Sequence, residues 1–189
     1  MSEQRGEAVI ARPGDRPRIT VRRADRPGDL GWTVMVHGEV YARQFGWNTD
    51  FEALVAGIVT AYAAGHDPDR EAGWIAEADG ERVGCVFLVA GDTPEVARLR
   101  ILLVTEAARG LGAGGRLVGT CLEFAREAGY RRVTLWTNDV LESARRIYQG
   151  YGFTLADEEP HHSFGRDLVG QNWTLDLAPG PHTAPPGTR

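Results

Sequence analysis

Among the features of this sequence, the glycine-rich segment Arg109–Gly115 restricts the possible folds most strongly. It follows an apolar run, Ile101–Val104, and precedes Leu117–Ala128, where apolar residues recur at helical spacing. The first N–H groups of a helix lack intrahelical partners and the helix dipole adds partial positive charge, so this turn suits a pyrophosphate. Arg109 adds a further positive charge. Close approach of a ligand to the backbone is possible at Gly110, Gly112, Gly114 and Gly115.

Three interpretations of the turn compete. A turn that binds nothing is disfavoured, because four glycines at a helix start cost conformational entropy. A dinucleotide site would use Gly110-x-Gly112-x-x-Gly115 with Asp139 after the next strand. In that fingerprint, however, the first glycine follows the strand immediately, whereas here residues 105–109 separate it from the strand. The missing Gly-Lys-Ser/Thr excludes a nucleotide-triphosphatase loop. The third interpretation is a loop for the pyrophosphate of coenzyme A.

Strand and helix patterns alternate along the rest of the chain, which indicates a three-layer α/β domain or a close relative. Asp79-Gly80 predicts a hairpin turn, and Thr49 with Glu52 predicts a capping box at a helix start. The predicted strands cover 19–21, 73–77, 82–89, 96–104, 133–137, 153–156 and 171–177. The predicted helices cover 30–45, 49–65, 117–128 and 140–149.

Length and composition describe an ordinary globular protein. The 189 residues suit one domain, which we expect at 18–177, between loose tails at 1–17 and 178–189. The net charge of −5 comes without a basic run, so a nucleic-acid partner is not expected. No apolar run reaches the length of a membrane span or a secretory signal, so we expect no membrane partner. Cys85 and Cys121 lie in apolar surroundings and are predicted to be reduced core thiols, which favours a cytoplasmic location.

Two linked motifs carry a family resemblance. Arg109-x-x-Gly112-x-Gly114 resembles the Arg/Gln-x-x-Gly-x-Gly/Ala signature of the GNAT acetyltransferases, and 144–153 resembles their second signature, an Ala, a Tyr and then Gly-Phe. The resemblance implies a GNAT fold of the α/β (α+β) class, with a central mixed, mostly antiparallel sheet of about seven strands and about four helices. Segments 135–141 and 159–165 look like the acetyltransferase half of bacterial proteins that join a MarR-type DNA-binding domain to a GNAT domain.

The resemblance also implies a reaction, the direct transfer of the acetyl group of acetyl-CoA to a primary amine without a metal. Leu102 and Val104 are expected to pair through their backbones with the pantetheine arm, and a main-chain N–H near Val104 to stabilise the thioester oxygen. Tyr148 matches the tyrosine that protonates the leaving thiolate, although its helical spacing also suits a core aromatic. The residues expected on the coenzyme are Leu102, Val104, Arg109, Gly110, Leu111, Gly112, Ala113, Gly114, Gly115, Asn138 and Ala144.

Two positions depart from the family pattern. Leu141 stands where many members carry Asn, so Asn138 is expected either to hold the coenzyme instead or to cap the next helix with Asp139. Arg98 stands where many members carry the Glu that deprotonates the amine through water. The general base is therefore unassigned, and the candidates are Glu39, Glu95, His161 and His162.

The acceptor is expected to be a small-molecule amine or an amine of a peptide or protein. His161-His162 suggests an acceptor-site loop or a solvated turn rather than a metal site, because adjacent histidines rarely face one metal. Tyr41 and Trp47 are expected on the acceptor side, from where the family places its first helices. Family members often form homodimers. The alternative function is a non-catalytic acyl-CoA-binding or regulatory module, which Arg98 motivates.

Overall fold

The computed structural model describes residues 17–177 of the 189-residue chain. The predicted tails at 1–17 and 178–189 lie outside the described residues, except for Pro17. Within 17–177, no helix is both long and apolar enough to cross a membrane. The elements in chain order are β1 (Ile19–Arg23), α1 (Asp29–Phe45), α2 (Thr49–Gly65), β2 (Ala72–Ala78), β3 (Glu81–Ala90), β4 (Val96–Val104), the 3-10 turn η1 (Glu106–Ala108), α3 (Ala113–Glu127), β5 (Arg132–Asn138), α4 (Glu142–Gly150), β6 (Thr154–Ser163) and β7 (Arg166–Asp176).

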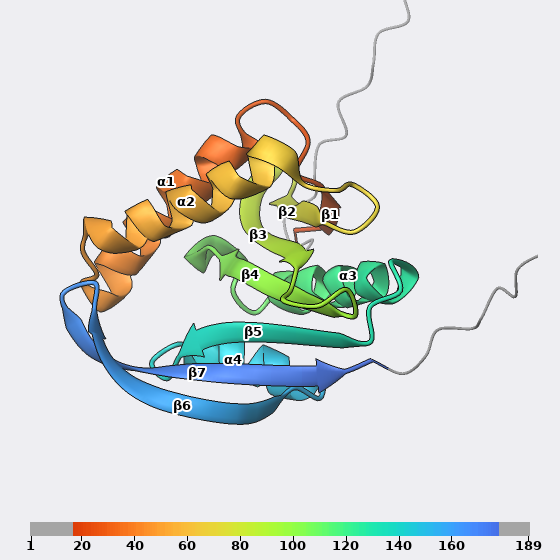
Figure 1. Ribbon diagram of the computed structural model, residues 1–189. Coiled ribbons are helices and arrows are strands. Elements are labelled where there is room, and N and C mark those ends of the chain that lie inside the picture. The colour runs from red at the N-terminus through yellow and green to blue at the C-terminus, as the bar shows by residue number, and fades with distance from the viewer. Residues whose placement is uncertain (1–16, 178–189) are drawn as a thin grey trace, which may run out of the picture.

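One seven-stranded sheet, in the order β1-β2-β3-β4-β5-β7-β6, runs through the molecule (Figure 1). Neighbouring strands are antiparallel except for β4 and β5, which are parallel. α1 and α2 cover one face, and α3 and α4 pack on the other. The part of the chain that the structure describes thus confirms the predicted fold class, a mixed, mostly antiparallel sheet of seven strands with four helices.

A hydrophobic core lies on each face of the sheet. Leu117, Cys121 and Tyr148 belong to the core under α3 and α4, whereas Val55 and Cys85 belong to the core under α1 and α2. Both cysteines are buried and free, as predicted. Burial raises the pKa of Cys85 to about 12 and also raises the pKa of Cys121, so both remain protonated thiols at neutral pH.

Turn chemistry explains the β2–β3 hairpin but not the predicted start of α2. Asp79 and Gly80 both have positive φ, at 50° and 89°, as the primed hairpin turns require, so the predicted turn is confirmed. The predicted capping box of Thr49 with Glu52 is wrong by one residue. Asn48 is the capping residue, and its side chain accepts a hydrogen bond from the Asp50 N–H at 3.1 Å.

The last hairpin is longer than its sequence pattern predicts. β6 and β7 pair along their whole length, from Thr154 with Thr174 to Ser163 with Arg166, instead of covering only 153–156 and 171–177. The side chains of β6 are almost all exposed, so the strand lacks the alternation of polar and apolar residues that marks a half-buried strand. His161 and His162 therefore lie in strand β6, and their predicted placement in a loop or a surface turn is wrong.

β4 and β5 separate halfway along their length, which is the feature that positions the site. They pair only where Val96–Leu99 lies beside Arg132–Leu135, and beyond that point the strands diverge (Figure 1). A bulge in β4 marks the separation, because Ile101 and Leu102 together lie opposite Val86 of β3. The gap leaves backbone edges of both strands without a strand partner on that side.

Candidate active site

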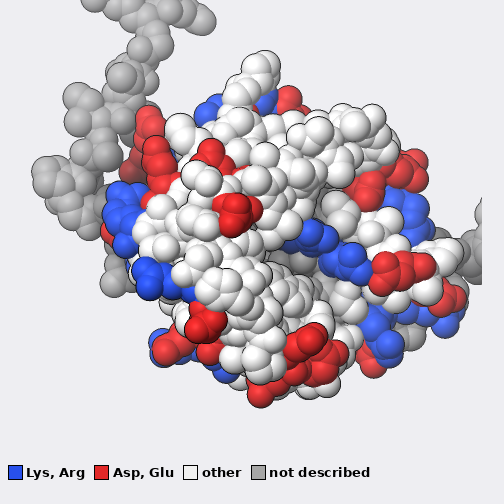
Figure 2. Space-filling model, turned by 60° about the vertical axis from the view of Figure 1, so that its left-hand side comes forward, with Lys and Arg blue, Asp and Glu red and all other residues white. Residues whose placement is uncertain are grey.

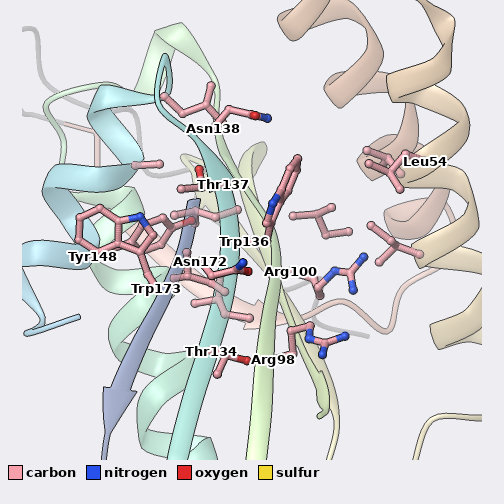
Figure 3. A pocket seen from close by; sticks show the side chains of 18 of the residues that line it. Leu54, Arg98, Arg100, Thr134, Trp136, Thr137, Asn138, Tyr148, Asn172 and Trp173 are labelled. Carbon is pink, nitrogen blue, oxygen red and sulfur yellow. The ribbon is translucent and has the colours of Figure 1, made fainter. Parts of the chain in front are cut away.

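A cavity of about 760 Å³ lies where β4 and β5 separate. It connects the two faces of the sheet, since its walls include Tyr41 and Leu54 on one side and Tyr148 and Trp173 on the other. Figure 3 shows Tyr148 and Trp173 on the α4 side, and Arg98 and Arg100 projecting from β4 toward α2. A molecule that enters from one face of the sheet can therefore reach a group that enters from the other.

The bulge places strained backbone in the wall of this cavity. Ile101 has φ of 46°, a conformation that a β-branched residue rarely adopts. Such strain persists only where the surrounding structure holds the backbone in place, and strained residues are frequent at functional sites. Ile101 lines the cavity together with Leu102, one of the residues expected on the coenzyme. Val104, the other expected strand residue, lies beyond the bulge opposite Gly84 and is half-buried.

His37 of α1 also lines the cavity, and sequence reasoning missed it. Burial lowers its pKa to about 4, and the hydrogen bond to the Thr33 carbonyl only partly opposes this, so the ring is neutral at pH 7. Nδ1 lies 2.8 Å from the Thr33 carbonyl oxygen, which accepts its proton. Nε2 is buried without a hydrogen-bond partner among the described residues. The sequence carries no signal for this residue beyond its helical spacing.

The glycine turn leads directly into α3, as predicted: Arg109–Gly112 precede the helix, and Gly114 and Gly115 lie in its first turn. Gly110 and Gly112 have positive φ, at 76° and 80°, and a Cβ at either position would meet no atom of the described residues within 4 Å. Gly112 precedes α3, and no side chain within 17–177 caps this helix end. Free backbone N–H groups and the positive end of the helix dipole thus adjoin open space, an arrangement suited to an anion.

Gly114 and Gly115 have a packing role in the same turn. A Cβ on Gly114 would lie 2.6 Å from Cδ1 of Ile147, so the glycine lets α4 pack closely against α3. The Gly115 carbonyl accepts a hydrogen bond from the Tyr151 hydroxyl at 2.6 Å. Leu111 is half-buried, and Ala113 is buried in the core. Of the predicted loop residues, Gly110 and Gly112 are thus the ones most open to a ligand.

Arg109 is directed toward α1 rather than across the turn. Its Nη2 donates to Oε1 of Gln44 at 2.6 Å, and Gln44 Nε2 donates to Oε1 of Glu106 at 2.9 Å. The guanidinium is half exposed and lies 4.0 Å from Glu106, so the ion pair is weak. These contacts join the glycine turn to the last turn of α1.

Asn138 and Ala144 both line the cavity. The buried Asn138 side chain does not cap α4, so the capping alternative is wrong: Leu141 stands at the cap position, and no side chain of the described residues caps that helix. Asn138 Oδ1 lies 2.9 Å from Nε2 of His161. With the amide oxygen on this side, Nε2 carries the proton, and Nδ1 accepts from the Ser163 hydroxyl at 2.9 Å.

Tyr148 is both a core residue and a cavity residue. Its side chain is 4% exposed, and its ring packs against Phe153 at a centroid distance of 5.7 Å. It also lines the cavity on the α4 side (Figure 3). Burial raises the pKa of the phenol above its ordinary value, so the hydroxyl keeps its proton at neutral pH. This is the protonation state that a general acid needs.

The four predicted bases do not contribute to the cavity wall. Glu39 and Glu95 are exposed, and His162 is exposed and contacts Asp167 at 2.7 Å. His161 is half-buried and bonded to Asn138. Arg98 does line the cavity, as do Tyr41 and Trp47, which come from α1 and from the segment before α2. Within 17–177, no group of three or more His, Cys, Asp or Glu residues could hold a metal ion.

The comparisons with known proteins agree with this geometry. Residues 35–153 match the sequence model of the acetyltransferase (GNAT) family. N-acetyltransferase 8B of Homo sapiens is 35% identical over 97 residues, which cover 49% of this chain and 43% of the relative. N-acetyltransferase 8 of Rattus norvegicus is 36% identical over 115 residues, which cover 58% of this chain and 49% of the relative. The chain thus spans less than half the length of these curated relatives.

Solved structures share the fold at low sequence identity. The yncA structure from Salmonella typhimurium, determined with its cofactor acetyl-CoA, has a TM-score of 0.67 and 20% identity and covers 90% of this chain and 99% of its own. A GNAT-family acetyltransferase of Staphylococcus aureus has a TM-score of 0.70 and 17% identity and covers 85% of this chain and 100% of its own. The match to the family model, the shared fold and the uncapped helix start at the glycine turn all indicate the same family. The chain belongs to the GNAT acetyltransferase family.

Proposed function

We propose that the protein is an acetyl-CoA-dependent N-acetyltransferase that transfers an acetyl group directly to a primary amine. The observation that carries this proposal is the cavity between β4 and β5, which joins both faces of the sheet and has Tyr148 in its wall. The glycine turn follows β4 closely in the chain, with Gly110 and Gly112 open to a ligand. An anion site and a two-sided cavity near one strand end suit a long phosphorylated donor that meets its acceptor inside the sheet.

The chain offers a separate contact for each part of such a donor. The N–H groups at the start of α3 would hold the pyrophosphate, with Gly110 and Gly112 allowing close approach. The backbone edges of β4 and β5 beyond their paired segments would hydrogen-bond the amide groups of the pantetheine arm, at Leu102 and Val104 in particular. Asn138 and Ala144 would line the same arm from the other side. Acetyl-CoA, when bound, supplies an acetyl group activated as a thioester.

Two groups of the protein would act on the reacting atoms. A main-chain N–H near Val104 would donate to the acetyl oxygen as negative charge grows there, and one such donor is commonly worth about 3 kcal/mol. Tyr148 would give its phenolic proton to the sulfur as the C–N bond forms and the C–S bond breaks. The raised pKa of Tyr148 keeps this proton in place until it is needed.

The amine would enter between α1, α2 and the sheet, past Tyr41 and Trp47. An ammonium group must lose a proton before it can attack, so a base is required. Glu39, Glu95, His161 and His162 stay candidates by residue type, but all lie outside the cavity wall. We therefore propose that the proton leaves the amine through water in the cavity, and the rate should rise with pH as more of the amine is neutral.

One observation favours a second function, a non-catalytic acyl-CoA-binding or regulatory module. Arg98 lines the cavity where many relatives carry the catalytic Glu, and the carboxylates of Glu39 and Glu95 lie outside it. Such a module would bind acetyl-CoA and leave every amine unmodified.

Turnover separates the two functions. Release of free coenzyme A would be followed with a panel of amines, for the wild type and for Tyr148→Phe. The sequence contains no lysine, so self-acetylation of lysine side chains cannot contribute to the signal. Turnover of an amine that falls at least tenfold in Tyr148→Phe supports the transferase, whereas acetyl-CoA binding without turnover of any amine supports the module.

Three finer expectations stay predictions. The likeness of 135–141 and 159–165 to the acetyltransferase half of MarR–GNAT proteins is one. A cytoplasmic location and a homodimer are the others, and size-exclusion chromatography with light scattering would measure the assembly.

A further inference from the structure

Two arginines of β4 line the part of the cavity that faces α2. Arg98 and Arg100 project from β4 toward α2 and its Leu54 (Figure 3). Basic side chains also border a hollow in the middle of the face shown in Figure 2. A cavity for a cationic amine would be expected to carry negative charge at this end, so the two guanidinium groups need an explanation.

Arg100 is a half-buried cation without a counter-ion. Within 17–177, its guanidinium forms neither a hydrogen bond nor an ion pair. Burial and the neighbouring charge of Arg98 lower its pKa, which is the sign of a cation held where charge is costly. A second hollow that Arg100 shares with Glu71 does not supply a partner, because the Glu71 oxygens accept from the backbone N–H groups of Ala90 at 2.8 Å and Asp67 at 3.0 Å.

Neighbouring charges leave this end of the cavity positive. Arg98 pairs with Asp92 at 2.8 Å, but the Asp92 side chain is 87% exposed, so the pair is weak and can open. The other acid in the cavity wall, Asp157, already accepts from the Asn172 side-chain amide at 2.8 Å. The residues that α2 contributes to the cavity wall, among them Leu54, Val55 and Ile58, are all apolar, and an apolar wall strengthens a contact between opposite charges.

We propose that the acceptor carries a carboxylate close to its amine, and that Arg100 binds this carboxylate with Arg98 as a second donor. The inference rests on the acetyl-transfer function proposed above. Arg100 directly precedes the bulge residues Ile101 and Leu102, and Leu102 is proposed to hold the pantetheine arm, so a carboxylate bound to Arg100 would lie near the donor and only a short spacer can separate it from the attacking nitrogen. Amino acids and derivatives with a free amine have this chemistry. A planar guanidinium matches a carboxylate with two parallel hydrogen bonds.

Matched pairs of acceptors test the assignment. Phenylalanine, leucine and β-alanine would each be compared with the corresponding amide, which keeps the amine and removes the carboxylate charge, with coenzyme A release as the readout. We expect kcat/KM for at least one acid to exceed that of its amide by about tenfold or more, mainly through KM, as a charge-assisted bidentate contact predicts. Arg100→Gln should abolish this preference, Arg100→Lys should retain part of it, and Arg98→Gln should reduce it less than Arg100→Gln.

Controls separate this inference from the proposed function. Arg126→Gln removes an exposed charge from α3, outside the cavity, and should keep the preference for acids. Arg100→Gln should bind acetyl-CoA like the wild type by calorimetry and should melt at or above the wild-type temperature, because it removes an unpaired, half-buried charge. Turnover of amides or simple amines equal to or better than that of acids would overturn the carboxylate assignment and leave the transferase standing. Loss of acetyl-CoA binding in Arg100→Gln would place Arg100 on the coenzyme and also overturn it, and turnover of no amine at all would overturn both.

Discussion

At the scale of single residues, Tyr148 is a packing residue and also the proposed general acid. Burial against Phe153 and the α3–α4 core fixes the ring, and the same burial raises the pKa of the phenol. A side chain held this firmly would lose little conformational entropy in the proposed proton transfer. Exposure and periodicity alone identify such a residue as core, and only the motif and its position in the cavity wall point to chemistry.

Replacing Tyr148 with Phe should remove the acid and leave the packing. We expect kcat to fall by about 10²-fold, the usual contribution of a general acid, with KM for acetyl-CoA little changed. The wild-type rate should not decline on the alkaline side up to about pH 10, because the raised pKa keeps Tyr148 protonated there. Tyr130→Phe is the matched control, a buried phenol outside the cavity. Equal losses in the two variants would show that Tyr148 acts only as a core residue.

At the scale of elements, the start of α1 is tied to the sheet through one buried acid. The Asp29 side chain is fully buried and pairs with Arg22 of β1 at 2.6 Å and with Arg82 of β3 at 2.9 Å. Its carboxylate also accepts from the Arg26 N–H at 3.0 Å. Burial alone would raise the pKa of Asp29, but the hydrogen bonds and the arginine charges outweigh it, and the pKa lies below its ordinary value.

Asp29→Asn should destabilise the fold by about 3 kcal/mol at pH 7, because it leaves two arginine charges without their buried partner. Since the pKa of Asp29 is lowered on folding, its contribution is fully present above the unfolded-state value near 3.8 and is lost as pH falls through the folded-state value. The difference between wild type and variant in urea unfolding should therefore shrink below about pH 4. Glu142→Gln, which breaks only the exposed pair with Arg146, should cost at most about 0.5 kcal/mol. A difference that grows toward acid pH would contradict the assignment.

Elements with a strong local signal could be predicted from the sequence, and those that depend on tertiary pairing could not. Asp79-Gly80 specifies its hairpin because the turn itself demands positive φ. The length of β6 depends on hydrogen bonds to β7 and leaves no hydrophobic pattern. The bulge at Ile101 and the separation of β4 from β5 depend on the register of strand pairing. The continuous apolar run of β4 does not reveal this register.

Some residues of the candidate site could likewise be predicted from the sequence, and others could not. The glycine turn and Tyr148 could be located from their motifs, whereas the motif could not tell that Gly114 serves α4 packing. His37 and Arg100 enter the cavity only through the packing of α1 and α2 on β4, so no local pattern indicates them.

At the scale of the whole molecule, the two cores meet at the gap in the sheet. α1 and α2 are held to one face and α3 and α4 to the other, and the cavity lies between β4 and β5 where neither core closes it. A ligand that fills this gap would bridge two halves of the sheet that share only the short pairing of Val96–Leu99 with Arg132–Leu135. Binding should therefore stabilise the whole fold.

Acetyl-CoA at about 100 times its Kd should raise the free energy of unfolding by about 2.7 kcal/mol. For a chain of this length, that corresponds to a rise in Tm of roughly 5–10 °C. Differential scanning fluorimetry with acetyl-CoA, coenzyme A and NAD would measure it. Tyr148→Phe should show the same rise as the wild type, and an equal rise with NAD would contradict a site built for coenzyme A.

A calorimetric titration of acetyl-CoA into the wild type, Gly112→Ala and Gly129→Ala tests most directly whether the glycine turn binds the coenzyme. Both glycines have positive φ, 80° and 81°, and open surroundings, so the two variants share the backbone strain, but Gly129 lies at the opposite end of α3 from the turn. We expect micromolar binding by the wild type and by Gly129→Ala, at least tenfold weaker binding by Gly112→Ala, and no binding of NAD. Absence of acetyl-CoA binding, or equal weakening in both variants, would contradict the assignment of the glycine turn to the coenzyme.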